Sequence, residues 1–124
     1  MTDASVIVLE FDEHQHEHED QRCELVRMAN IFLSYRGRRV IFIRYNPDAF
    51  KVGGVTLVTK RETREAVLLA TLKEALANAD YDNSIIVHYI CYDVPADTGG
   101  SQYVQTFKFA NVIDYQSWVE ATPQ

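Results

Sequence analysis

The stretch SVIVLEFDEHQHEHEDQRCELVRMANIFLSYRGRRVIFIRY, Ser5 to Tyr45, decides the expected fold of this chain. Its first seven residues are rich in β-branched side chains and predict a buried strand. Residues 19–37 then carry apolar side chains with the spacing of one helical face, namely Leu25, Met28, Ala29 and Phe32. A second strand is predicted at 39–45. Strand, helix and strand in succession favour a parallel pair joined by a right-handed crossover.

The rest of the chain extends this pattern. Residues 51–60 contain two glycines and predict a loop with a short extended piece. A helix is predicted at 61–80, with an apolar stripe of Leu68, Leu69, Leu72, Ala75, Leu76 and Ala79. Strands follow at 84–94 and 102–112, paired as a hairpin. A short helix at 114–121 would take Asp114 as its N-cap.

These elements predict an α/β fold in which a mixed β-sheet is flanked by helices. With 124 residues, the whole chain 1–124 is expected to form one domain. In such sheets, ligands and chemistry gather at the ends of strands. Charged side chains at strand ends are therefore the first candidates for function.

Bulk composition narrows the possible functions. The formal net charge is −6, which argues against a protein that coats nucleic acid through bulk electrostatics but not against an enzyme acting on it. No apolar stretch is long enough to span a bilayer, and no signal-peptide pattern opens the chain, so we expect a soluble intracellular protein. Cys23 and Cys91 are far apart and lie in apolar-patterned segments, which predicts buried thiols.

The end of the first strand carries a candidate metal site. Glu10 and Asp12 are two residues apart, so on a strand they share a face. Adjacent carboxylates repel each other unless a cation neutralises them, and hard divalent ions such as Mg²⁺ or Mn²⁺ favour such oxygen ligands. The alternative is that one of the two acids faces solvent at a frayed strand end.

Further candidate site residues are three histidines that follow these acids in the sequence and two polar residues at the end of the second strand. His14, His16 and His18 alternate and would share a face if extended, which could hold a softer metal such as Zn²⁺. A solvated turn between strand and helix, with a single functional histidine, is the alternative. Arg44 and Asn46 end the second strand and, if the strands are parallel, would lie beside Glu10 and Asp12. Arg44 would then bind phosphate or, alternatively, pair with an acid of the helix.

These motifs together resemble a known family. VLEFDEHQH, a helix with CELVRM and the strand RRVIFIRYNPDAF are similar to a restriction-endonuclease-like domain of large DNA viruses and some protists. That domain has an E-x-D-E-x-Q-H motif, a helix with an R-M pair and a strand ending F-I-R-F-N-P-D. It is similar, more distantly, to very-short-patch repair endonucleases within the PD-(D/E)XK superfamily. The resemblance covers residues 6–50 well and the later helix and strand loosely.

The resemblance implies a Mg²⁺-dependent (or Mn²⁺-dependent) endonuclease acting on DNA, located in the cytoplasm or nucleus of a virus-infected cell. Glu10 and Asp12 would be catalytic and hold the metal. Gln15 and His16 match the Q-H pair, with His16 activating water or contacting phosphate. The substrate-binding residues would be Arg27, Arg44 and Asn46. Hydrolysis would use water that the metal activates.

The chain also departs from the superfamily pattern. We expect no counterpart of the N-terminal hairpin that supplies the first metal-binding aspartate, because Asp3 is the only acid before the strand and lies at the wrong end of it. A rearranged chain, a site completed by another subunit and a loss of catalysis are all open. The second hypothesis is therefore a catalytically inactive viral interaction or assembly module on the same fold. An uncovered sheet edge would further predict a homo-oligomer.

Overall fold

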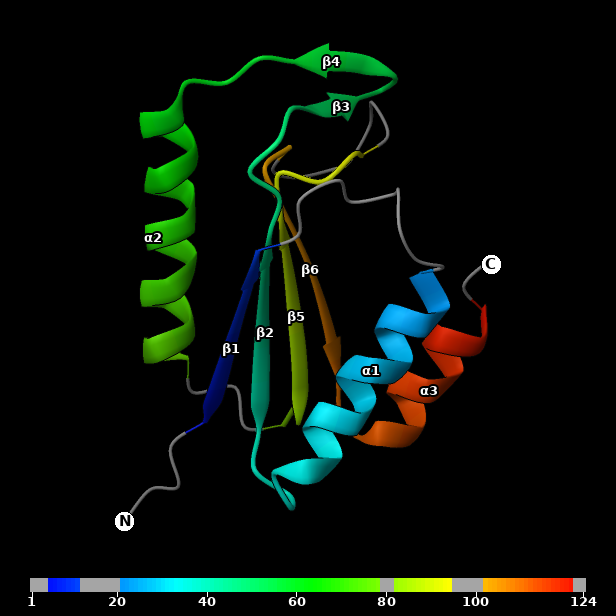
Figure 1. The fold of residues 1–124 in the computed structure, drawn as a ribbon. Helices are drawn as coiled ribbons and strands as arrows, with labels where there is room; N and C mark the ends of the chain where they lie inside the picture. The colour runs from blue at the N-terminus through cyan, green and yellow to red at the C-terminus, as the bar shows by residue number, and fades with distance from the viewer. Residues whose placement is uncertain (1–4, 12–20, 79–81, 95–101, 122–124) are drawn as a thin grey trace.

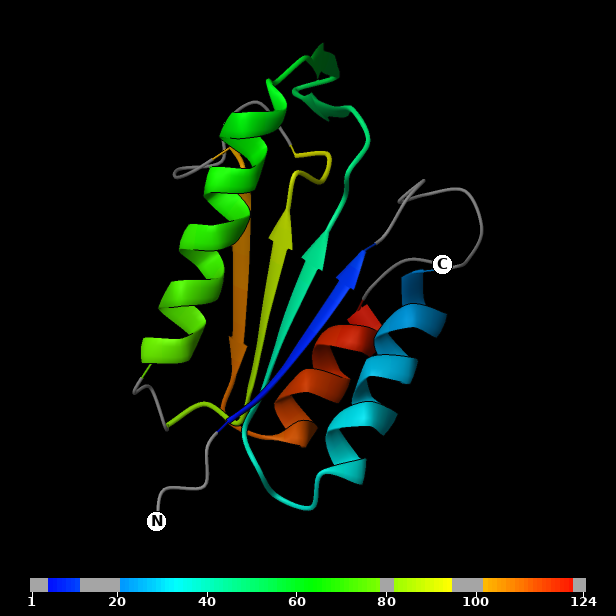
Figure 2. The ribbon, with the colours of Figure 1, turned by 60° about the vertical axis from the view of Figure 1, so that its left-hand side comes forward.

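A four-stranded sheet separates two layers of helices (Figures 1 and 2). The structure, a computed structural model, describes residues 5–11, 21–78, 82–94 and 102–121. Its elements are β1 (Val6–Phe11), α1 (Gln21–Ser34), β2 (Val40–Tyr45), β3 (Phe50–Val52), β4 (Val55–Leu57), α2 (Arg61–Ala77), β5 (Ile85–Ile90), β6 (Val104–Phe109) and α3 (Val112–Ala121). The prediction of a mixed sheet flanked by helices is confirmed.

The sheet has the order β1-β2-β5-β6. β1, β2 and β5 are parallel, and β6 is antiparallel to β5, as the predicted hairpin requires. All six residues of β2 are buried, because helices cover both faces of this central strand. β1 and β6 form the two edges.

The alternation of side chains along the strands divides the core into two halves. On one face, Val40, Phe42 and Val87 pack against α1 and α3. On the other face, Ile41, Ile43 and Ile86 pack against α2. The apolar face predicted for α1 is confirmed, since its four residues Leu25, Met28, Ala29 and Phe32 are all buried.

The two parallel connections have opposite hands. Both step across the sheet in the same direction, from β1 to β2 and from β2 to β5, but α1 and α2 lie on opposite faces (Figures 1 and 2). The β1–α1–β2 connection is right-handed, as predicted. The β2–α2–β5 connection is therefore left-handed, which is rare, and it runs through the β3–β4 hairpin rather than directly into the helix.

The β3–β4 hairpin replaces the loop predicted at residues 51–60. Gly53 and Gly54 both have positive φ angles, +61° and +81°, as a two-residue turn between antiparallel strands requires. The amide of Gly53 donates to the carbonyl of Val94 at 2.8 Å, and that of Val94 donates to Lys51 at 2.9 Å. The hairpin is thereby held against the segment that follows β5.

Two predictions about helix α2 and helix α3 need correction. Leu69 and Leu76 are 51% and 70% exposed rather than buried, because α2 rests on the sheet through a narrower face centred on Arg64, Thr71 and Ala75. Ala79 lies outside the described residues. α3 begins at Val112, so Asp114 is in its first turn. The Oδ1 atom of Asn111 accepts from the Asp114 amide at 2.9 Å and is the N-cap.

The two cysteines differ in their environment. Cys91 is buried, as predicted, and burial raises the pKa of its thiol. Cys23 is exposed, contrary to the prediction, because the apolar face of α1 is formed by the residues around Leu25 and Met28 and does not extend to it. No helix in the described ranges is long and apolar enough to cross a membrane.

His88 makes the stability of this fold depend on pH. The side chain is 3% exposed, and its Nδ1 atom lies 2.8 Å from the Thr106 hydroxyl. Burial lowers the pKa of His88; Glu74 acts in the raising direction and Lys108 in the lowering direction. The unfolded chain therefore binds more protons than the folded chain just below the ordinary histidine pKa of about 6.5.

We predict that the free energy of unfolding falls as the pH is lowered from 7.5 through about 6.5 and below, until the folded protein also protonates His88. The variant His88→Gln should lose less stability over the same interval. Urea unfolding at pH 7.5 and 5.5 measures both differences. An equal loss in the wild type and the variant would contradict this role of His88.

Candidate functional site

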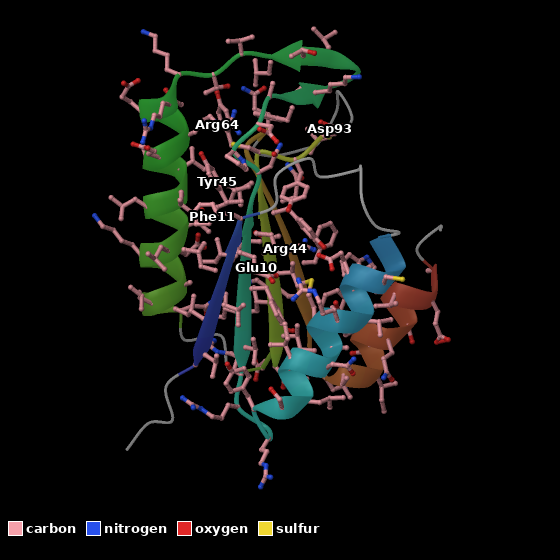
Figure 3. The ribbon with its side chains drawn as sticks, in the orientation of Figure 1. Glu10, Phe11, Arg44, Tyr45, Arg64 and Asp93 are labelled. Atoms are coloured by element: carbon pink, nitrogen blue, oxygen red, sulfur yellow. The ribbon has the colours of Figure 1, made fainter. Side chains whose placement is uncertain are left out.

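Two acids and two arginines meet at the carboxyl end of β1. The register pairs Glu10 of β1 with Arg44 of β2, and their side chains lie on the α1 side of the sheet (Figure 3). Phe11 and Tyr45, one residue further on, lie on the α2 side (Figure 3). Glu24 and Arg27 enter from the N-terminal half of α1. We call Glu10, Glu24, Arg27 and Arg44 the ion-pair cluster.

Arg27 joins the two acids. Its Nη2 atom donates to Oε2 of Glu10 at 2.7 Å, and its Nε atom donates to Oε2 of Glu24 at 3.0 Å. The hydrogen bond to Glu24, together with that to Glu10, raises the pKa of Arg27 further above its ordinary value. The Arg27 side chain is 44% exposed, so this bridge lies at the surface of the cluster.

Arg44 forms the buried side of the cluster. Its side chain is 6% exposed, and its Nη2 atom donates to Oε1 of Glu24 at 3.0 Å. The Nε atom lies 3.8 Å from Oε1 of Glu10. The guanidinium also lies 3.6 Å from the sulfur of Met28 and 5.9 Å from the centre of the Tyr89 ring. An arginine that is this deeply buried requires the charge of the acids beside it.

Arg44 pairs with an acid of the helix, as one of its two interpretations predicted; that acid is Glu24, which was not singled out by number in the sequence. Glu10 lacked an upstream partner acid, but α1 brings a second carboxylate to the same arginines. The signal was present in the sequence: Glu24 and Arg27 are three residues apart on a helix and therefore share a face. The predicted helix already included Glu24, but only the structure shows that this helix lies on the Glu10 side of the sheet.

Asn46 has a different environment from Arg44. Its side chain is fully buried, and its Nδ2 atom donates to the carbonyl of Cys91 at 2.8 Å. Its Oδ1 atom accepts from the Asp48 amide at 3.0 Å, which closes the turn predicted at Asn46-Pro47-Asp48. The structure thus places Asn46 in the turn after β2 and does not bring its amide to the ion-pair cluster.

A second buried arginine supports the same turn. Arg64, in the first turn of α2, donates through Nη2 to the carbonyls of Asn46 and Asp48. Its guanidinium lies 5.8 Å from the Tyr45 ring and 5.7 Å from the Phe50 ring. This residue was not singled out in the sequence, because nothing in the spacing of RETREAV distinguishes a buried arginine from a solvated one. It positions the end of β2 and therefore Arg44.

The remaining predicted site residues, Asp12, Gln15 and His16, lie outside the described residues, as do His14 and His18. Within the described ranges, no three histidine, cysteine, aspartate or glutamate side chains gather as a metal-binding group. Oε1 of Glu10 is buried and accepts no hydrogen bond from any residue that the structure describes.

Topology makes this strand end a suitable place for a ligand. The connection from β1 leads to α1 on one face, and the connection from the neighbouring β2 leads to α2 on the other. In open α/β sheets, ligands bind outside the carboxyl ends of strands where neighbouring connections diverge in this way. The ion-pair cluster lies at that point.

Scans against family models, curated proteins and solved structures return no match for this chain. The function of the site is therefore inferred from its geometry and from the sequence motifs.

We predict that Arg44→Met lowers the free energy of unfolding by about 2 kcal/mol, because two partly buried acids lose the cation between them. Urea unfolding measures the change. Arg61→Met is the control, since Arg61 pairs with Glu65 in solvent at 2.7 Å and this variant should unfold at nearly the wild-type midpoint. Equal effects of the two substitutions would show that Arg44 has no special structural role.

Proposed function

We propose that this chain is a divalent-metal-dependent nuclease domain, or a domain derived from one, that acts on DNA phosphodiesters. The observation that carries the proposal is the pairing of Glu10 and Glu24 with Arg27 and Arg44 at the diverging strand ends. Carboxylates are suitable ligands for Mg²⁺ or Mn²⁺, and guanidinium groups are suitable partners for phosphate. The sequence resemblance to restriction-endonuclease-like domains supports the same chemistry.

The residues present fit such a metal ion. Oε1 of Glu10 is buried without a hydrogen bond from a described residue, and an oxygen in that state gains from a cation. Glu10 and Asp12 would hold the metal, with Glu24 close to the same arginines. A bound Mg²⁺ supplies Lewis-acid stabilisation of the charge that develops on phosphate and lowers the pKa of water.

The protein side chains would have distinct tasks. Arg44 is buried and in contact with both acids, so it would hold Glu10 and Glu24 in place. Arg27 is partly exposed and would exchange a carboxylate for a phosphate oxygen of the substrate. Gln15 would contact the phosphate, and His16 would contact the phosphate or accept a proton from the attacking water. Because the net charge is −6, affinity for DNA would come from these local arginines rather than from the whole surface.

The proposal predicts cleavage of plasmid and single-stranded DNA in the presence of Mg²⁺ or Mn²⁺. Glu10→Gln keeps the size of the side chain but removes its charge, and it should lower the cleavage rate about 100-fold or more. Asp12→Ala should have a comparable effect. Gel assays with both substrates, run with and without EDTA, measure the rates.

The control is Glu65→Gln, which removes an exposed carboxylate of α2 that takes part in a surface ion pair. This variant should cleave at the wild-type rate. Circular dichroism should show that all variants are folded. Cleavage by Glu10→Gln at the wild-type rate, or cleavage unaffected by EDTA, would refute the nuclease proposal.

One observation favours a second function, a catalytically inactive interaction or assembly module on the same fold. The two acids and two arginines of the cluster neutralise each other within the domain, as a purely structural network would. Melting temperature distinguishes the two functions, because an ion that binds the native state must raise it. We predict a rise with Mn²⁺ that is absent in Glu10→Gln. A wild type that shows no rise would favour the inactive module.

A further inference from the structure

Among the described strands, β1 pairs only with β2 and forms one edge of the sheet. The amide of Val6 donates to the carbonyl of Arg39 at 2.8 Å, so Val6 bonds towards β2. In a parallel pair the direction alternates, so Val8 and Glu10 also bond towards β2. Ile7, Leu9 and Phe11 therefore direct their amide and carbonyl groups outward.

The same edge exposes apolar side chains. Leu9 is 42% exposed and Phe11 is 64% exposed. Phe11 lies on the face that carries α2 (Figure 3), and Leu9, two residues earlier on the strand, lies on the same face. α2 contacts the sheet through Arg64, Thr71 and Ala75 and runs antiparallel to β1 (Figure 2). In a right-handed helix with this direction and this buried face, Leu69 and Leu76 lie on the flank towards β1. An apolar surface thus runs from the helix to the open edge.

The other edge of the sheet carries a charged residue. β6 exposes Thr106, Lys108 and Phe107, whose ring stacks on Trp118 of α3, and a lysine on an edge strand opposes pairing with another strand because its charge would be buried. β1 has no charged residue on its α2 side, and its only charge, Glu10, points to the other face and is engaged with Arg27. Of the two edges, β1 is the one suited to accept a further strand.

We infer that β1 pairs with β1 of a second copy of this chain, in the antiparallel direction, to form a twofold dimer. An antiparallel pair about a twofold axis matches each outward amide with an outward carbonyl of the same sequence. Centring the axis on Leu9 uses all three outward residues of both copies, with Leu9 opposite Leu9 and Ile7 opposite Phe11. Glu10 then lies opposite Val8.

Alternative registers are less favourable. Moving the centre by one residue towards the C-terminus would place the two Glu10 side chains directly opposite each other, which is repulsive. Moving it towards the N-terminus would leave Phe11 of each copy beyond the strand of the other. In the Leu9 register, the apolar flanks with Leu69 and Leu76 approach across the axis and cover Leu9 and Phe11.

The dimer has one eight-stranded sheet. Because the twofold axis is perpendicular to the sheet, both ion-pair clusters lie on the same face, one near each end of the paired β1 strands. This inference does not depend on the proposed function, since it uses only the edge and the α2 side of the sheet. It concerns Ile7, Leu9 and Phe11, whose side chains lie on the opposite face of β1 from Glu10.

The test combines mass and cross-linking. Light scattering at micromolar concentration should give the mass of two chains for the wild type. Leu9→Lys should halve that mass, while Val58→Lys, a substitution at a valine that is 89% exposed away from β1, should leave it unchanged. Circular dichroism should match the wild type for both variants, because neither position is buried.

The register is tested separately in a Cys23→Ser background, which removes the exposed native thiol. Hydrogen-bonded antiparallel partners have Cα atoms about 5.5 Å apart, a distance that a disulfide spans. Leu9→Cys should therefore form a cross-linked dimer under mild oxidation, and Val58→Cys should not. A monomeric wild type, a dimer that Leu9→Lys does not dissociate, or equal cross-linking of the two cysteine variants would overturn the inference.

Discussion

A buried guanidinium group requires a negative charge beside it, and Arg44 creates this requirement at the centre of the structure. Its strand is covered on both faces, so water cannot solvate the side chain. The acids that satisfy it come from β1 and from α1, two elements that are separated along the chain. The position of α1 on the sheet is thus fixed by charge as well as by the apolar contacts of Leu25 and Met28.

The same condition links the two halves of the molecule. Arg64 reaches from α2 to the turn after β2, and its guanidinium lies near both the Tyr45 and the Phe50 ring. Asn46 ties that turn to the segment after β5. The end of β2 is therefore held from both faces, which keeps Arg44 and its acids in one arrangement. A site that depends on fixed charges requires such support.

The sequence predicted the strands and helices well where one physical signal dominates. β1, β2 and β5 are runs of β-branched residues, and α1 has an unambiguous apolar face. It predicted less where two signals compete. Leu69 and Leu76 carry the spacing of a buried face, but burial depends on how much of the helix the sheet can cover. Asn111 and Asp114 are both residue types that cap helices well. Which of them is the N-cap depends on where α3 begins, and the structure shows that it is Asn111.

For the site, the positions of Glu10 and Arg44 at the ends of two parallel strands predicted that they are neighbours. The register of β1 and β2 confirms this. Glu24 was missed because its role depends on the tertiary position of α1. Asn46 was expected beside them because it follows the same strand. Its side chain instead satisfies main-chain groups, a demand that the sequence does not reveal.

The strand order has a consequence for the path of folding. β2 pairs with both β1 and β5 in the parallel direction. In the sequence β1, which begins at Val6, precedes β2, and β5, which begins at Ile85, follows it. Neither pairing can form as a local hairpin, so long loops must close before the sheet gains stability. Among the described strand pairs, β5 with β6 and the small β3–β4 hairpin are the ones that can form early from nearby residues. We therefore expect slow folding, because the apolar strand β1 is synthesised before β2 and stays unpaired until β2 has emerged.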